Sequence, residues 1–267
     1  TAMLRKETTE TIAHHTLCLT GGFLGIYALL IREGTFGSAE TSNLILLVVS
    51  GLTGTLGELL VRLGAVGCYA SGIALAVVGR RYWRPFRLRC LSIAVTTAAC
   101  LACAWIPGEA DPLLALYPVF FATAIQWVAY TQAAGFNSAT IFSTNNLRQS
   151  VEGLTDYLCT REEKYFRKFA FYGATLLCFH LGVALGWWCV QRWGIPSVLA
   201  CLPLLGGGLA VTVLDERTKE SKDAPRSCRE ASSLICATFC RPRSPGPLRR
   251  PRTRTPAGAS HRRRDRS

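Results

Sequence analysis

Six long apolar runs decide what this chain can fold into. About 20 helical residues cross the hydrocarbon core of a bilayer, and each run is close to that length. The runs cover residues 12–31, 58–79, 88–107, 113–132, 169–191 and 196–214. None carries the polar stripe that a helix on the surface of a soluble protein needs. The sequence therefore predicts an all-α integral membrane protein with about six transmembrane helices.

The composition of the runs and their borders agrees with this prediction. Glycines such as Gly182 and Gly186 recur inside them, and small residues let helices pack closely in lipid. Trp83, Trp105 and Trp193 lie near the ends of runs, where aromatic side chains form interfacial belts. Charged residues make up only 18% of the chain, below the roughly 25% typical of soluble domains.

Two further segments are helical in pattern but cannot cross a bilayer as ordinary spans. Residues 41–53 are apolar, but a helix of that length reaches only about 20 Å, against a core of about 30 Å. Residues 143–158 place Leu147, Val151 and further leucines on one side and charged residues on the other. Such a helix cannot face lipid all round. We expect two short half-helices, either re-entrant or interfacial.

The distribution of basic residues selects an orientation. The loops at 80–89 and 161–168 are rich in Arg and Lys, whereas the loop at 107–112 has none and the turn at 192–196 has only Arg192. By the positive-inside rule, the first two loops are cytoplasmic and the other two face out. If both short segments crossed completely, one basic loop would face out. If each enters and leaves on one side, every loop obeys the rule. We therefore predict a multi-pass protein with both termini in the cytoplasm.

The two short segments resemble each other. Residues 36–39 (FGSA) match residues 136–139 (FNSA), and residues 41–44 (TSNL) match residues 144–147 (TNNL) at nearly the same displacement. Each copy follows one span and precedes two more, so an odd number of spans turns the second copy over. The expected architecture is an inverted 3+3 repeat. Chance is the alternative, because short Ser, Thr and Asn strings recur in many sequences.

The predicted organisation has four parts. They are a cytoplasmic amino-terminal segment, repeat A, repeat B and a basic tail, at residues 1–11, 12–107, 113–214 and 215–267.

The tail holds 15 Lys or Arg against 6 Asp or Glu and is rich in Pro and Ser, a composition typical of disorder. It could bind anionic lipid headgroups. Nucleic acid is not expected as a partner, because stacking aromatic residues are nearly absent. The tail could also be simply solvated, or the product of a wrong reading frame or splice model.

The motifs resemble a known family. Residues 21–27 (GGFLGIY), 34–36 (GTF) and 41–44 (TSNL), together with the segment 126–154, are similar to the YoaK-like family of small bacterial and fungal integral membrane proteins. That family is a domain of unknown function, so the resemblance implies a membrane location, suggests transport and supplies no substrate. The chain departs from the family pattern at its central glycines and at an aspartate in the first span. These positions hold Ser42, Asn145 and Gly25 here.

The starts of the two half-helices are the leading candidates for a site. Thr41 or Ser42, and Thr144 or Asn145, could act as N-caps, and the positive ends of the two helices could together hold a small solute or line a pore. Capping without any ligand is the alternative. Glu40 could attract cations, whereas Gln126, inside a span, more often bonds a neighbouring helix. The candidate substrate-binding or pore residues are Glu40, Thr41, Ser42, Asn43, Gln126, Thr144, Asn145 and Asn146.

Two functions remain open from the sequence. The first is a transporter or channel for an unidentified small solute, and the second is a non-transporting membrane scaffold or regulatory subunit that binds other helices. An enzyme is not expected, because the chain has no phosphate-binding glycine loop, no HExxH and no contextual Ser/His/Asp arrangement. No cofactor or metal is expected either. The expected partners are the lipid bilayer and a small solute.

Overall fold

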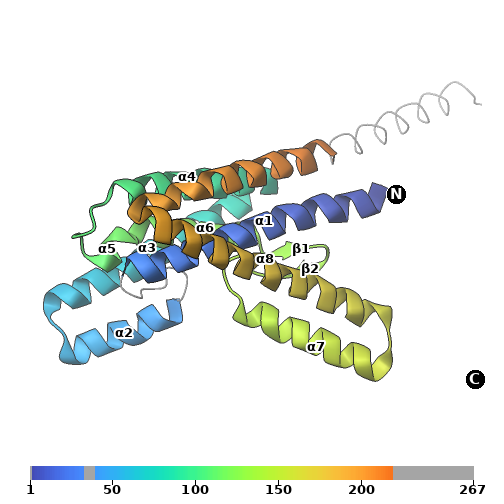
Figure 1. Cartoon of the computed structure of the whole chain (residues 1–267), viewed down its shortest axis with the longest axis horizontal. Coiled ribbons are helices and arrows are strands. Elements are labelled where there is room, and N and C mark those ends of the chain that lie inside the picture. The colour runs from blue at the N-terminus through green and yellow to red at the C-terminus, as the bar shows by residue number, and fades with distance from the viewer. Residues whose placement is uncertain (1, 33–39, 219–267) are drawn as a thin grey trace, which may run out of the picture. The chain divides into compact units, whose positions relative to one another are not determined.

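The computed structural model describes residues 2–32 and 40–218, and the side chains among them from residue 9 onward. Among these residues, five helices are long and apolar enough to cross a membrane. They are Thr9–Ile31 within α1 (Ala2–Ile31), α3 (Leu56–Tyr82), α4 (Pro85–Trp105), α8 (Glu163–Trp193), and Ile195–Thr218, which opens with the 3-10 turn η1 (Ile195–Ala200). These helices confirm the prediction of an α-helical membrane protein, whereas the count of six spans and the inverted repeat are not confirmed by them (Figure 1).

The fourth predicted span, at 113–132, is not one continuous helix. It divides into α5 (Pro112–Ala115) and α6 (Tyr117–Ala129), with Leu116 between them. Pro118 stands in the first turn of α6, and a proline has no N–H to donate to the preceding turn. The α6 helix is 13 residues long, so it falls short of the length that crosses a bilayer alone.

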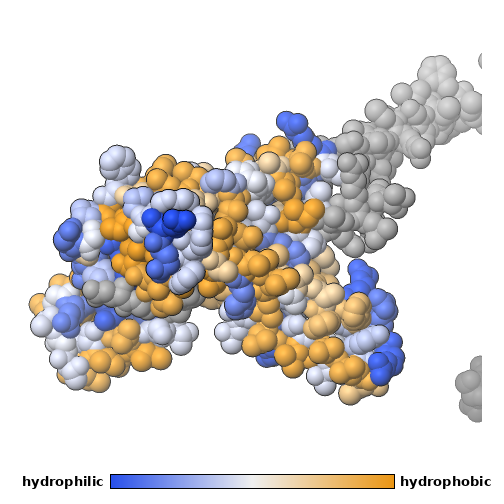
Figure 2. Space-filling model, in the orientation of Figure 1, coloured by the Kyte–Doolittle hydropathy of each residue, from blue (hydrophilic) through white to orange (hydrophobic). Residues whose placement is uncertain are grey.

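Both short segments form helices, as predicted. They are α2 (Glu40–Thr53) and α7 (Thr144–Thr160), and each folds back on the long helix that follows it, α2 on α3 and α7 on α8. Their outer faces expose apolar side chains, which give the apolar surface over both hairpins in Figure 2. These exposed residues include Leu44, Ile45, Val48, Val49 and Leu52 in α2, and Leu147, Val151, Leu154 and Leu158 in α7.

Glycines allow the long helices to approach at backbone distance. A methyl group on Gly182 of α8 would overlap the carbonyl oxygen of Leu19 in α1, and one on Gly22 would overlap that of Phe179. In α3, a Cβ on Gly72 would lie 2.7 Å from the carbonyl oxygen of Phe121 in α6. The helix pairs α1 with α8 and α3 with α6 therefore form the packed interior. Helices in lipid associate through such close packing at small residues, because the hydrophobic effect does not drive them together there.

A small hairpin that the sequence analysis did not predict leads into α7. The strands β1 (Gln132–Ala133) and β2 (Phe136–Asn137) pair antiparallel, with Ala133 opposite Phe136. The turn between them holds Ala134 at φ 50° and Gly135 at φ 81°, the left-handed values of a type I′ turn. The hydroxyl of Tyr172 in α8 donates to the carbonyl of Asn137 at 2.6 Å and anchors the hairpin.

An ion cluster joins three helices at the end of the bundle where α1 begins. The guanidinium of Arg89 in α4 pairs with Glu10 at 3.2 Å and with Asp215 at 3.5 Å, and Thr9 donates to Asp215 at 3.0 Å. Asp215 is buried and helical, so the folded part runs beyond the predicted tail boundary at 215. The strings at 34–39 and the remainder of the tail, from residue 219, lie outside the described residues.

Candidate functional site

The starts of α2 and α7 line one cavity of about 740 Å³. In Figure 1 the two helices begin near the middle of the bundle and run away from each other. The cavity volume lies within the roughly 300–1,000 Å³ that is usual for small-molecule sites. The structure thus brings together most of the predicted candidates, namely Glu40, Thr41 and Ser42 from α2 with Thr144 and Asn145 from α7.

The rest of the cavity wall is largely apolar and includes four aromatic side chains. Tyr69 of α3, Trp127 of α6 and Phe179 of α8 contribute, with Phe142 from the segment before α7. The ring centroids of Tyr69 and Trp127 are 6.4 Å apart, and those of Trp127 and Phe142 are 5.2 Å apart. Sequence reasoning missed these residues, because an aromatic residue inside an apolar run carries no local signal of a site.

Tyr69 brings a polar atom to this aromatic wall. Its side chain is 4% exposed, and its hydroxyl is buried with no hydrogen-bond partner among the described residues. One carboxylate oxygen of Glu40, Oε1, is likewise buried and unpartnered in the described structure. A buried polar atom without a partner is costly, so both are available to a ligand that enters the cavity.

The N-cap predictions need correction. The α7 helix begins at Thr144, so its N-cap is Ser143, whose side chain makes no capping hydrogen bond. Thr41 and Ser42 follow Glu40 and therefore stand inside the first turn of α2. The first-turn N–H groups of α7 have no acceptor from within their own helix. That end of α7 faces the cavity with its partial positive charge, and Glu40 places a carboxylate at the corresponding end of α2.

Asn146 follows the lining residues Thr144 and Asn145 and fixes the segment that leads into α7. It is 2% exposed, and its amide nitrogen donates to the carbonyls of Ala139 and Phe142, both at 2.9 Å. Its Oδ1 accepts a hydrogen bond from Ser138 at 2.9 Å. The equivalent Asn43 makes a simpler contact, in which Nδ2 donates to Glu40 Oε2 at 3.0 Å. Both asparagines support the site and are not part of its wall.

Gln126 is also a supporting residue, as one reading of the sequence expected. Its Nε2 donates to Thr140 at 2.9 Å and to the carbonyl of Leu17 at 3.3 Å, so it ties the segment before α7 to α1. His14, which sequence reasoning did not link to this region, bonds the hydroxyl of Ser138 at 3.0 Å. A buried polar chain from His14 through Ser138 to Asn146 therefore fixes the second half-helix.

The sequence itself places the chain in a family. Residues 14–214 match the family described as "Protein of unknown function (DUF1275)". The chain belongs to the DUF1275 family. The resemblance to YoaK-like proteins is consistent with this membership. The DUF1275 region contains every residue that lines the cavity between α2 and α7, so this site belongs to the family domain and not to the basic tail. No curated protein and no solved structure matches the sequence.

Proposed function

We propose that this DUF1275 protein is a transporter or channel for a small solute, which binds in the cavity between α2 and α7. One observation carries the proposal, namely that the starts of two half-helices, far apart in the sequence, line a single cavity. Binding sites in many transporters form in this way, from interrupted helices at the interface between two repeats.

An inverted repeat is the second part of the proposal, and the helix packing supports it. The hairpin of α2 on α3 corresponds to that of α7 on α8, and the contact of α1 with α8 corresponds to that of α6 with α3. Buried residues of α3 and α8 follow the same spacing. The five buried residues of α3 stand at 65, 69, 72, 76 and 79, and five of the eight buried residues of α8 stand at 175, 179, 182, 186 and 189.

The equivalent positions in this alignment also have equivalent surroundings. Gly72 meets the carbonyl of Phe121 in α6, and Gly182 meets that of Leu19 in α1. Three residues before these glycines stand Tyr69 and Phe179, and both line the cavity. A two-fold axis that relates the two halves of the chain would account for both the matched glycines and the matched aromatic residues.

The topology that fits this repeat has six crossings and two re-entrant half-helices, with α5 and α6 together forming the fourth crossing. Figure 1 places the turn between α2 and α3 at the end where α4 finishes, and the turn between α7 and α8 at the end where α1 begins. With the basic loops inside, the first turn faces out, the second faces the cytoplasm, and both termini are cytoplasmic.

The cavity wall favours a particular kind of solute. The first-turn N–H groups of α7 need an acceptor, whereas the carboxylate of Glu40 needs a donor or a cation. The aromatic wall suits a small apolar body between these polar ends. We therefore expect a small polar or zwitterionic solute.

Flux through proteoliposomes tests this function. Purified full-length protein should speed the entry of at least one probe among glycerol, urea and glycine, measured by stopped-flow light scattering against empty liposomes. Glu40→Gln and Tyr69→Phe should slow that flux about tenfold, because the first removes the negative charge from the cavity wall and the second removes a hydroxyl that can bond the solute. Lys164→Gln is the matched control, since Lys164 is exposed at the start of α8, pairs with the exposed Glu162 and does not line the cavity.

Two results would count against the function. One is a folded, reconstituted protein that carries none of the three probes, which would favour a scaffold or regulatory subunit. The other is a Lys164→Gln variant that slows flux as much as Glu40→Gln does, which would place the effect outside the cavity.

A further inference from the structure

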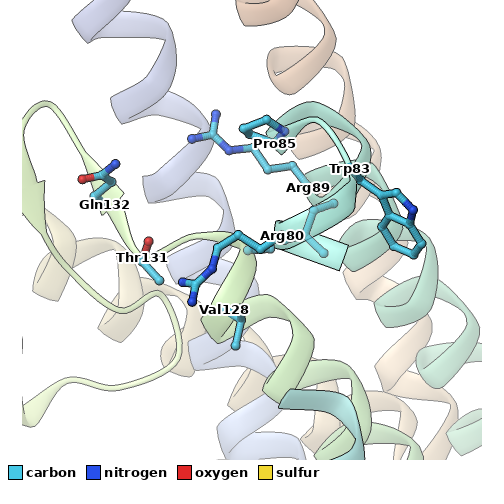
Figure 3. A pocket seen from close by; sticks show the side chains of 9 residues that line it. Arg80, Trp83, Pro85, Arg89, Val128, Thr131 and Gln132 are labelled. Atoms are coloured by element: carbon cyan, nitrogen blue, oxygen red, sulfur yellow. The ribbon is translucent and has the colours of Figure 1, made fainter. Parts of the chain in front are cut away.

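A second, smaller cavity lies at the end of the bundle where α3 finishes and α4 begins. It measures about 140 Å³, several times the roughly 30 Å³ that one water occupies. Arg80 and Trp83 line it from the end of α3, Pro85 and Arg89 from the start of α4, and Thr131 and Gln132 from the segment after α6. In Figure 3 the guanidinium groups of Arg80 and Arg89 extend toward the segment that carries Thr131 and Gln132.

The charged side chains in this wall are both positive. Arg80 has no ion-pair partner within the described part of the chain, and no acidic residue lines the cavity. Arg89 uses its two terminal nitrogens on Glu10 and Asp215, and its Nε is buried without a partner among the described atoms. The cavity is therefore lined by one guanidinium without an ion-pair partner, that of Arg80, and by Arg89, which keeps one N–H without a partner in the described structure.

Two further features favour an anion here. The α4 helix starts at Pro85, which lines the cavity, so the positive end of this 21-residue helix adjoins the cavity. The N-cap of α4, Arg84, makes no side-chain capping bond. Thr131 and Gln132 add side chains that can donate hydrogen bonds to oxygen atoms. Guanidinium groups match the oxygens of phosphate in a two-point geometry, which makes arginine a preferred phosphate ligand.

The position of the cavity identifies the source of such a phosphate. It lies at the ends of two apolar helices that are long enough to cross a membrane, beside Trp83 and the arginine-rich segment 80–89. Tryptophan and arginine at such helix ends mark the headgroup layer of the bilayer. We propose that this cavity is a phosphate-binding site that takes the headgroup of an anionic phospholipid. The site is separate from the solute cavity and does not depend on the transport function.

Lipid retention tests the site in the full chain. The protein is placed in phosphatidylcholine nanodiscs with a small fraction of phosphatidylglycerol, and the lipids that stay bound are counted by native mass spectrometry. Arg80→Gln should weaken retention of phosphatidylglycerol about tenfold, because it removes a charged, two-point hydrogen-bond donor. Thr131→Val, which keeps the shape of its side chain, should weaken it less. Arg87→Gln is the matched control, since Arg87 belongs to the same basic segment and does not line the cavity.

A parallel measurement distinguishes the two sources of phosphate. Inorganic phosphate is added to nanodiscs of phosphatidylcholine alone, and the thermal unfolding midpoint is recorded. A rise that depends on Arg80, without any preference for phosphatidylglycerol, would support a phosphate site filled from solution. Equal loss of lipid in Arg80→Gln and Arg87→Gln would overturn the site in favour of diffuse charge attraction. Absence of binding in both experiments would overturn it as well.

Discussion

Replacement of Gly182 by alanine is expected to destabilise the protein by about 2–3 kcal/mol, although alanine is the better helix former. The added methyl group would overlap the carbonyl oxygen of Leu19 in α1. That oxygen belongs to the backbone and cannot turn aside, so α1 and α8 must move apart. The movement opens the contact along Gly186 and Gly22 as well, because the same pair of helices meets there.

A second glycine provides the matched control for this change. Gly206 lies in the last described helix, and a Cβ placed on it meets nothing within 4 Å. Gly206→Ala should therefore leave stability unchanged or raise it by about 0.5–1 kcal/mol through the higher helix propensity of alanine. Thermal unfolding of the detergent-solubilised variants measures both changes. A Gly182→Ala midpoint equal to that of Gly206→Ala would show that α1 and α8 do not pack at backbone distance.

Replacement of Asn146 by alanine is expected to cost about 3 kcal/mol of stability, whereas the same change at Asn145 should cost less than about 0.5 kcal/mol. Asn146 is buried and makes hydrogen bonds with Ser138, Ala139 and Phe142. Its loss leaves two buried carbonyls without this donor, and the hydroxyl of Ser138 keeps only its contact with His14 among the described residues. Asn145 is exposed, and within the described part of the chain its side chain accepts one long bond, 3.3 Å, from Arg148.

The two asparagines should separate stability from flux. Asn145 lines the solute cavity, so Asn145→Ala should alter flux while the unfolding midpoint stays near that of the wild type. Asn43→Ala should cost about 1 kcal/mol, because among the described residues Asn43 makes a single side-chain bond, to Glu40. If Asn146→Ala unfolds at the same temperature as Asn145→Ala, the polar chain from His14 to Asn146 does not hold the second half-helix.

The positions of the long helices could be predicted from the sequence because each depends on local hydropathy. The starts of α2 and α7 could also be predicted from local sequence, because the strings TSNL and TNNL occur at matching places in the two halves. The break at Leu116 had a local signal in Pro118, but the apolar run continued through it and concealed the interruption. The turn at Ala134 and Gly135 is too short a signal to predict the hairpin by itself.

The parts that the sequence could not predict depend on contacts between distant segments. The role of Asn146 follows from Ser138 and His14, and neither contact has a local pattern. Tyr69 and Phe179 correspond only when α3 and α8 are aligned by their buried residues, at a displacement that differs from that of the half-helices. The folded boundary near Asp215 depends on Arg89, which lies in another helix.

The sidedness of the two hairpin turns tests most directly whether the half-helices enter from opposite faces of the membrane. Cys159 is exposed at the end of α7, and Thr53 is exposed at the end of α2. A Thr53→Cys variant is treated with a membrane-impermeant maleimide in right-side-out and in inverted vesicles, and mass spectrometry locates the label on each peptide. The inverted repeat predicts that Cys159 reacts only in inverted vesicles and the new cysteine only in right-side-out vesicles. Reaction of both in the same vesicles would contradict it.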